Sequence, residues 1–248
     1  MNTTLHRPTA LITGGAKRVG ARIAAHLAAS GHDLVLHYHR SHAEAETLAA
    51  QLRADHGITV TLHPADLEQT GALDHFWDGL PVCDLLVVNA AIIERDTLAD
   101  FSAAQLQRQL AVNLEAPLML AQGFMAQLPT ERFGNIIVLG DGTMGWSIAP
   151  QFFTYSISKH AWVAAIDLLA AAIAPRARAN LLALPPLLPN MGEDDALFER
   201  LARRAPLQRT GSPDEVCSAI DFLLASPGVT GQTISLANGM GVSSSRPG

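Results

Sequence analysis

Tyr155 and Lys159 are the two side chains of this sequence best suited to acid–base chemistry. Their spacing of four places both on one face of a helix, so that they can meet at the same substrate atom. A phenol with an ordinary pKa of about 10 is a poor acid–base catalyst at neutral pH, and a neighbouring ammonium lowers that pKa by favouring the phenolate. Such a pair is ordinary on a helix surface, but this one follows a predicted strand and the Gly140-Asp141-Gly142 turn.

A glycine-rich turn with the sequence TGGAKRVG occupies residues 13–20, between a predicted strand and a predicted helix. Glycines let the backbone approach a diphosphate at the positive end of a helix. The spacing is not the six-residue glycine fingerprint of dehydrogenases with separate substrate domains. It is not a P-loop either, because Ala21 and Arg22 stand where Lys and Ser or Thr would be required. A tight turn without a ligand is the alternative. We predict a dinucleotide site that includes Gly14, Arg18, Val19 and Gly20.

The second predicted strand ends in the sequence HYHRS at residues 37–41, which contains no acidic residue. An enzyme that prefers NAD would carry an acid here to accept from the ribose hydroxyls. Arg40 and Arg18 can instead hold a 2′-phosphate through charge-assisted hydrogen bonds, and His39 and Ser41 add donors, so we predict NADPH or NADP as the cofactor. His37 and His39 share one face of a strand, which suggests a metal site as the alternative. No third ligand is evident nearby, so we predict no metal.

Length and composition favour one domain spanning residues 1–248. The 248 residues are 48% hydrophobic, which is enough to bury one large core. Short apolar runs alternate with longer amphipathic segments, which predicts a doubly wound, Rossmann-type α/β fold with seven parallel strands and helices on both faces. We predict strands at 10–13, 33–38, 59–63, 84–88, 135–139, 178–184 and 233–236. We predict helices at 19–30, 43–56, 68–79, 103–127, 152–174 and 213–225.

The rest of the chain indicates its partners and surroundings. Residues 185–205 interrupt the alternation with prolines and acids, which predicts a loop and short helix over the substrate site. The chain carries 17 basic and 23 acidic residues, a net charge of −6, and no long run of like charges, so a nucleic-acid partner is not expected. No signal peptide or apolar run of membrane-spanning length is evident, and Cys83 and Cys217 lack metal-ligand spacing. We therefore expect a cytoplasmic protein with no membrane partner.

Several motifs together resemble the short-chain dehydrogenases/reductases from end to end. They are TGGAKRVG at 13–20, Asp66-Leu67 after the third predicted strand, Asn89-Ala90-Ala91 after the fourth, Asn113, and YSISK at 155–159.

The resemblance implies a role for each matching residue. Tyr155 would protonate a carbonyl or imine as hydride arrives, and Lys159 would bind the nicotinamide ribose and lower the pKa of Tyr155. Asn113 would hold a water of the proton relay, and Asp66 would contact the adenine. The cofactor would also run along Leu67, Asn89, Ala90 and Pro185.

Within that family, Arg18 and the HYHRS sequence resemble the pteridine reductases, a subgroup that tends to carry aspartate in place of the catalytic serine. Asp141 stands close to that position, but it precedes Tyr155 by one residue more than the family usually shows. Either Asp141 or Gly142 therefore occupies the position, and Asp141 has a plain turn residue as its alternative role.

The expected substrate pocket departs from that subgroup. Ile93 stands where the pteridine reductases place the aromatic residue that stacks on the pterin ring. Trp146 and Phe152 flank the predicted site and can supply an apolar wall for a flat substrate, with core packing as the alternative.

These features predict NADPH-dependent reduction of a C=O or C=N bond in a small molecule. A pteridine-like heterocycle is the first candidate substrate, and general carbonyl or 3-oxoacyl-type reduction is the alternative. A non-catalytic NADPH-binding regulator is a third interpretation, disfavoured because it would not need Tyr155, Lys159 and Asn113. The predicted helices 103–127 and 152–174 carry more apolar positions than one sheet face needs. Together with the resemblance this predicts a homo-oligomer, a tetramer or otherwise a dimer.

Overall fold

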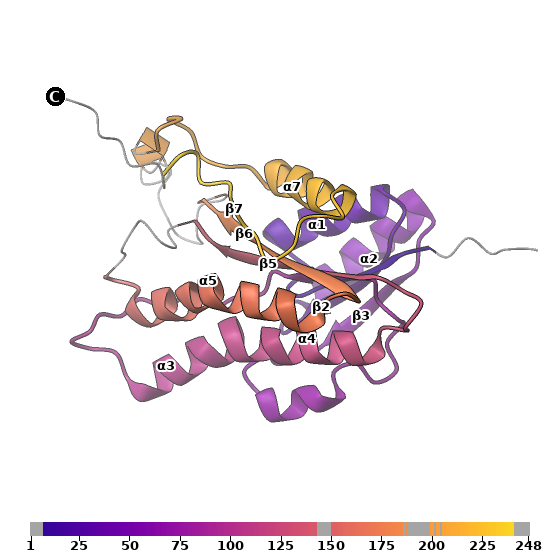
Figure 1. Ribbon diagram of the computed structural model, residues 1–248, viewed down its shortest axis with the longest axis horizontal. Helices are drawn as coiled ribbons and strands as arrows, with labels where there is room; N and C mark the ends of the chain where they lie inside the picture. The colour runs from indigo at the N-terminus through magenta and orange to yellow at the C-terminus, as the bar shows by residue number, and fades with distance from the viewer. Residues whose placement is uncertain are drawn as a thin grey trace, which may run out of the picture.

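A seven-stranded sheet forms the centre of the computed structural model, which describes residues 7–142, 150–185, 187, 199–200, 202–203 and 205–240 (Figure 1). All neighbouring strands are parallel, in the order β3-β2-β1-β4-β5-β6-β7. The strands are β1 Thr9–Ile12, β2 Asp33–Tyr38, β3 Val60–Pro64, β4 Leu85–Val88, β5 Gly134–Asp141, β6 Ala177–Leu184 and β7 Thr233–Ser235. The predicted doubly wound fold is confirmed, and every predicted strand end lies within two residues of the observed one.

Helices cover both faces of this sheet (Figure 1). One face carries α1 Arg18–Ala29, α2 His42–His56 and α7 Pro213–Ala225. The opposite face carries α3 Ala103–Leu110, α4 Ala116–Gln127 and α5 Phe153–Ile173. Parallel strands need such crossovers, and helices on both faces leave the strands between them buried on both sides.

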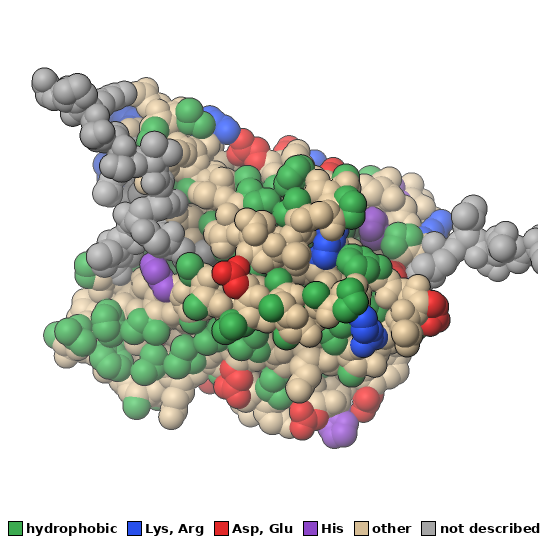
Figure 2. Space-filling view, in the orientation of Figure 1, with side chains coloured by type: hydrophobic (Ala, Val, Ile, Leu, Met, Phe, Trp, Pro, Cys, Tyr) green, Lys and Arg blue, Asp and Glu red, His purple; other side chains and the backbone are tan. Residues whose placement is uncertain are grey.

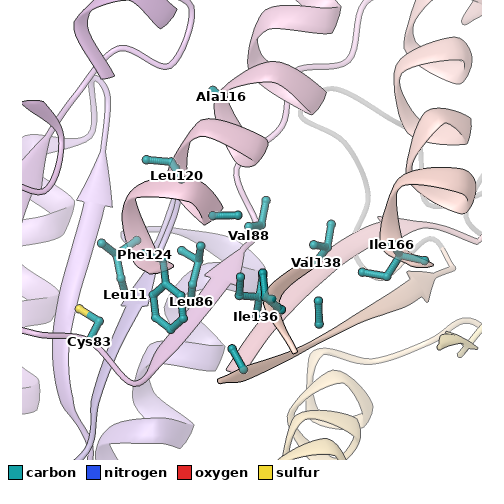
Figure 3. Close-up of a cluster of buried hydrophobic side chains, with 14 of the residues drawn as sticks. Leu11, Cys83, Leu86, Val88, Ala116, Leu120, Phe124, Ile136, Val138 and Ile166 are labelled. Carbon is teal, nitrogen blue, oxygen red and sulfur yellow. The ribbon is translucent and has the colours of Figure 1, made fainter. Parts of the chain in front are cut away.

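Each central strand contributes side chains to two separate cores. Successive residues of a strand point to opposite faces, so Leu11 packs on the side of α4 while Ile12 packs on the side of α1. Figure 3 shows the first of these cores, where Leu11, Leu86 and Phe124 lie together between sheet and helix. These strands therefore read in the sequence as continuous apolar runs rather than as alternating ones.

Two predicted helices differ from the structure. The helix predicted at 68–79 is only a 3-10 helix, Thr70–His75, because Gly71 weakens it and Gly79, with a φ of +73°, turns the chain out of helical geometry. The helix predicted at 103–127 is interrupted by a π-helical turn, Ala111–Glu115, which separates α3 from α4. This turn contains Asn113, one of the predicted catalytic residues.

By length and composition, α5 is the one described helix that could cross a membrane, with a mean hydropathy of 1.3. This corrects the expectation from the sequence that no segment reaches that length. In the structure one side of α5, including Trp162 and Ile166, is buried against the sheet, as in a helix that covers a core. The loop predicted at 185–205 lies largely outside the described residues. Pro185, at its start, directly follows β6 and is buried.

Candidate active site

A cavity of about 590 Å³ opens beyond the carboxyl ends of β1, β2, β3 and β4. The strand order reverses here, because β1 pairs with β2 on one side and with β4 on the other. Ligands of open parallel sheets bind in the crevice at such a switch point. Six of the predicted cofactor residues line the cavity: Gly14, His39, Arg40, Asp66, Leu67 and Ala90.

The glycine turn is held open by contacts between backbones. Gly14 has a φ of +62°, and a Cβ added to Gly20 would lie 2.2 Å from the carbonyl oxygen of Gly14, so neither position accepts a side chain readily. The Asn89 amide donates to the carbonyls of Thr13 (2.8 Å) and Gly14 (3.1 Å). The Thr13 hydroxyl oxygen accepts from the backbone N–H groups of Asn89 and Ala90, both at 2.9 Å. Asn89 therefore holds the backbone of the glycine turn in place through these hydrogen bonds.

The start of α1 is suited to an anion. Arg18 begins the helix with a φ of +53°, a left-handed conformation that costs a non-glycine residue about 1–3 kcal/mol. Lys17 at the N-cap position provides no side-chain cap for the N–H groups of this first turn, which continues through Val19. Uncapped N–H groups at a helix N-terminus bind phosphate well. A diphosphate thus fits the turn by shape and by charge.

His37 is a structural part of the turn rather than a metal ligand. Its Nδ1 accepts from the backbone N–H of Gly14 (3.1 Å), and its Nε2 donates to the carbonyl of Ala65 (3.1 Å). Burial lowers the pKa of His37 to about 4, which keeps the ring neutral as these two bonds require. Both ring nitrogens are thus engaged, so the metal site considered for His37 and His39 has no support on His37.

The part of the cavity beyond β2 and β3 contains both basic and acidic side chains. His39 Nε2 lies 3.7 Å from Asp66 Oδ2, and Leu67 is buried beside them. Arg40 is exposed and lines the same cavity, and within the described residues no acidic side chain pairs with it. Ser41 follows as the N-cap residue of α2 without using its hydroxyl as a cap. Arg40 is therefore free to meet an anionic group of a ligand in this cavity.

Asp141 and Tyr155 are in direct contact. The Tyr155 hydroxyl donates to Asp141 Oδ2 at 2.9 Å. Strand β5 continues to Asp141, two residues beyond its predicted end, and so carries this carboxylate to the start of α5. Gly142 instead donates its N–H to the Leu184 carbonyl, where an added Cβ would lie 2.5 Å from that oxygen. Of the two residues left open by the sequence, it is Asp141 that faces the tyrosine.

The pKa of Tyr155 differs from the sequence-based expectation. Burial raises it well above its ordinary value, and the negative charge and hydrogen bond of Asp141 raise it further. The sequence predicts the opposite direction, with Lys159 lowering the pKa of Tyr155. The phenol of this arrangement is therefore protonated across the neutral range and is a proton donor.

Lys159 is buried, with 6% exposure, and its Nζ donates to the Leu139 carbonyl at 3.2 Å. Burial lowers its pKa to about 8, while the nearby Asp141 carboxylate acts in the opposite direction. Near neutral pH its ammonium remains mostly charged within the site.

Asn113 connects the π turn to α5 and to the segment that follows β4. Its side chain accepts from the Ile92 N–H and donates to the Ile92 carbonyl, both at 2.9 Å, and lies 3.0 Å from the Ser158 hydroxyl. Its own carbonyl accepts from the indole N–H of Trp162 at 2.8 Å. The π turn allows these contacts, because the extra residue displaces the backbone at Asn113 from regular helical geometry.

Comparison with known proteins identifies the family of this chain. A family model described as enoyl-(acyl carrier protein) reductase matches residues 14–241. A crystal structure of FolM alternative dihydrofolate reductase 1 from Brucella canis, complexed with NADP, is 33% identical and covers 97% of this chain and 96% of that one, with a TM-score of 0.87. This chain belongs to the short-chain dehydrogenase/reductase family.

Two further relatives show how broad that family is. The oxidoreductase YmfI from Bacillus subtilis, whose name calls it uncharacterized, is 29% identical over 93% of this chain and 98% of its own length. A 3-oxoacyl-[acyl-carrier-protein] reductase from Synechocystis is 27% identical over 96% of this chain and 98% of its own length.

The substrate side of this short-chain dehydrogenase/reductase is only partly described. Phe152 packs edge-on to Tyr155, with 6.5 Å between ring centroids, and the guanidinium of Arg95 lies 4.8 Å from the centre of its ring. Ile93 is 46% exposed and lies in sequence between Ile92 and Glu94, which line the cavity. Trp146, predicted as a second wall, lies outside the described residues. Phe152 thus packs against Tyr155, with one ring face covered by Arg95, and its role as a wall of the substrate pocket stays a prediction.

Sequence reasoning missed the supporting residues of this family member. The sequence suggests only a metal-ligand role for His37, and no motif indicates Asp96, which contacts the first turn of α5. Each acts on a segment distant in sequence, so spacing gives no signal for it. The one feature that His37 and Asp96 share is that each is a buried polar side chain close in sequence to a motif, and such side chains need hydrogen-bond partners.

Proposed function

We propose that this protein is an NADPH-dependent reductase of a C=N or C=O bond in a small molecule, and that a pteridine-like heterocycle is its first candidate substrate. The observation that carries the proposal is the protonated Tyr155 hydroxyl held on the Asp141 carboxylate at the carboxyl edge of the sheet.

NADPH supplies a hydride when bound, and the chain's own residues have the remaining tasks. The glycine turn and the start of α1 bind the diphosphate, and Arg40 pairs with the 2′-phosphate. Tyr155 delivers a proton to the substrate nitrogen or oxygen, and the buried ammonium of Lys159 stabilises the phenolate that this leaves. The Brucella relative, with NADP in its crystal structure, supports this choice of cofactor.

The carboxylate of Asp141 favours a heterocycle over a simple carbonyl compound. To protonate a substrate, the Tyr155 hydroxyl must turn from Asp141 to the substrate atom, and the Asp141 carboxylate can then accept a hydrogen bond from a donor on the substrate. A ring with N–H or amino groups beside its C=N bond offers that donor, whereas a ketone offers none. The name of the Brucella relative, a dihydrofolate reductase, agrees with this reasoning.

The exposed aliphatic Ile93 favours the second candidate, reduction of a carbonyl such as a 3-oxoacyl thioester. No aromatic ring stands at that position to stack on a flat substrate. The Synechocystis relative carries a name of that kind.

The first experiment tests the proton donor. Tyr155→Phe keeps the ring and removes the hydroxyl, so the protein should fold and bind NADPH while kcat falls by a factor on the order of 10² to 10⁴, the range for a positioned general acid. The measurement is the rate of NADPH oxidation with saturating cofactor, on whichever of dihydrofolate, a dihydropteridine or a 3-oxoacyl thioester the unmodified protein reduces. An unchanged rate for Tyr155→Phe would show that the proton comes from elsewhere.

The second experiment separates the two substrate classes. Asp141→Ser keeps an acceptor for the tyrosine and removes the carboxylate. It should lower kcat/KM for the dihydropteridine roughly tenfold or more, the loss of one hydrogen bond to a charged group, and spare the 3-oxoacyl thioester. Equal losses on both would remove the argument for the heterocycle.

A further inference from the structure

Helix α5, which carries Tyr155 and Lys159, begins without a cap of its own. Phe152 occupies the N-cap position and cannot accept a hydrogen bond through its side chain. A helix start leaves several N–H groups without intrahelical partners, and a buried start needs acceptors for them. Thr154, in the first turn, is completely buried, so water does not serve it.

The missing cap comes from Asp96, in the segment that follows β4. Its Oδ1 accepts from the backbone N–H of Thr154 at 3.0 Å, and its Oδ2 accepts from the Thr154 hydroxyl. The Asp96 side chain is buried, with 4% exposure. Within the described residues no Lys or Arg pairs with it, so the positive end of α5 and these two donors are what offset its burial.

The backbone reinforces this contact. Asp96 forms a parallel bridge with Phe152, in which its N–H donates to the Gln151 carbonyl and its carbonyl accepts from the Phe153 N–H, both at 3.2 Å. Arg95, the preceding residue, places its guanidinium over the Phe152 ring. The first turn of α5 is therefore fastened to this segment from the N-cap residue to the residue just before Tyr155.

The other end of the same segment belongs to the cofactor cavity. Asn89 holds the glycine turn, Ala90 lines the cavity, and Ile92 is bonded to Asn113 through its backbone. A single stretch of eight residues, 89–96, thus connects the phosphate-binding turn to the start of the catalytic helix. Its length and its two attachments set how far the start of α5 stands from the glycine turn.

We propose that Asp96 is a positioning residue: by capping α5 from outside the helix it fixes the Tyr155 hydroxyl relative to the cofactor site. This inference rests on the proposed function, because it requires Tyr155 to act as the proton donor. Small displacements of a reacting group lower rates steeply, so a loose α5 start would reduce catalysis without emptying the cofactor site.

The test compares Asp96→Ala and Asp96→Asn with a matched control. Ser212→Ala removes an equivalent N-cap, since Ser212 caps α7 through the N–H of Glu215, on the opposite face of the sheet. With saturating NADPH, Asp96→Ala should lose kcat on the order of 10²-fold while the KM for NADPH changes little. Asp96→Asn keeps an oxygen for the Thr154 N–H and should recover much of that loss. Ser212→Ala should lower Tm and leave kcat unchanged.

A pH profile distinguishes positioning from mere stabilisation. If Asp96→Ala moves Tyr155 away from Asp141, the pH dependence of kcat should shift, whereas Ser212→Ala should keep the unmodified profile. If Asp96→Ala does not fold, Thr154→Val provides the same test, because it removes only the hydroxyl bond to Asp96. Unmodified kcat and pH profile in the folded Asp96 or Thr154 variant would overturn the proposal. Tyr155→Phe, measured in parallel, shows whether the proposed function itself fails.

Discussion

At the scale of single residues, Lys159 is an amine whose burial disfavours its charged form. Its ammonium lies fully inside the protein, and this burial lowers its pKa from 10.5 to about 8. A charged group taken out of water destabilises the fold unless its partners compensate, and here the partners are one carbonyl and one carboxylate. Active sites commonly keep such groups at the expense of stability.

This burial predicts a pH-dependent gain from Lys159→Met. Between about pH 8 and pH 10.5 the unfolded chain binds the proton that the folded chain has released, so the stability of the unmodified protein rises with pH in this window. Near neutral pH the cofactor-free variant should be more stable by about 1–3 kcal/mol, and the gain should shrink towards about pH 10. Denaturant unfolding at both pH values measures this. A variant that is less stable at both would show that the ammonium is well compensated.

Arg40 predicts the choice of cofactor. Its exposed guanidinium lines the cavity, and no acid follows β2 to bind ribose hydroxyls. Arg40→Ala should raise the Kd for NADPH roughly 10- to 100-fold, the value of a hydrogen bond to a charged group, and leave the Kd for NADH unchanged. Arg22→Ala, which removes an exposed arginine paired with Asp214, is the control. Titration of both cofactors decides, and equal Kd values in the unmodified protein would refute the prediction.

At the scale of secondary-structure elements, the sequence predicts the strands well and the helices on one face less well. Buried parallel strands are apolar runs bounded by turns, so β2 is predicted from end to end. The interruption between α3 and α4 has no such signal, because apolar spacing continues through a π turn with only one residue of shift. The 3-10 helix Thr70–His75 is shorter than the helix predicted at 68–79 because Gly71 and Gly79 outweigh the apolar positions of that segment.

The residues of the site also divide into those that local sequence patterns predict and those that they do not. Tyr155, Lys159 and the glycine turn are predicted because their roles depend on local spacing and on the order of elements. The Asp141 contact depends on where β5 ends, and element ends are the least predictable feature of a sequence. The Asp96 cap depends on a contact across 58 positions of sequence, which no local pattern encodes.

At the scale of the whole molecule, we expect the face formed by α4 and α5 to join copies of this chain. Figure 2 shows apolar side chains gathered on the side of the molecule where α3, α4 and α5 lie. Leu168 is 71% exposed on α5, and Val163 on α5 and Leu118 on α4 are exposed as well. Between these helices lies an apolar groove that includes Met125 and Leu169. Solvent-exposed apolar surface of this kind is typical of subunit contacts.

This expectation is tested by the oligomeric state. The unmodified protein should sediment as a dimer or tetramer, and Leu168→Glu combined with Val163→Glu should shift it towards the monomer, because a buried unpaired carboxylate opposes association. Phe222→Glu is the control, because Phe222 is exposed on α7, on the opposite face of the sheet, and its substitution should leave the oligomeric state unchanged. A monomer at all concentrations for the unmodified protein would exclude the interface.

The number of residues in the π turn at Ala111–Glu115 sets the rotation of α4 about its axis relative to α3. Each residue advances an α-helix by about 100°, so deleting one residue there would turn α4 about its axis by that angle relative to α3. Leu120 and Phe124, now fully buried, would swing away from the sheet. Insertions and deletions should therefore be tolerated in the loop after α4 but not at this point, because a change of one residue here would rotate the buried face of α4 away from the core.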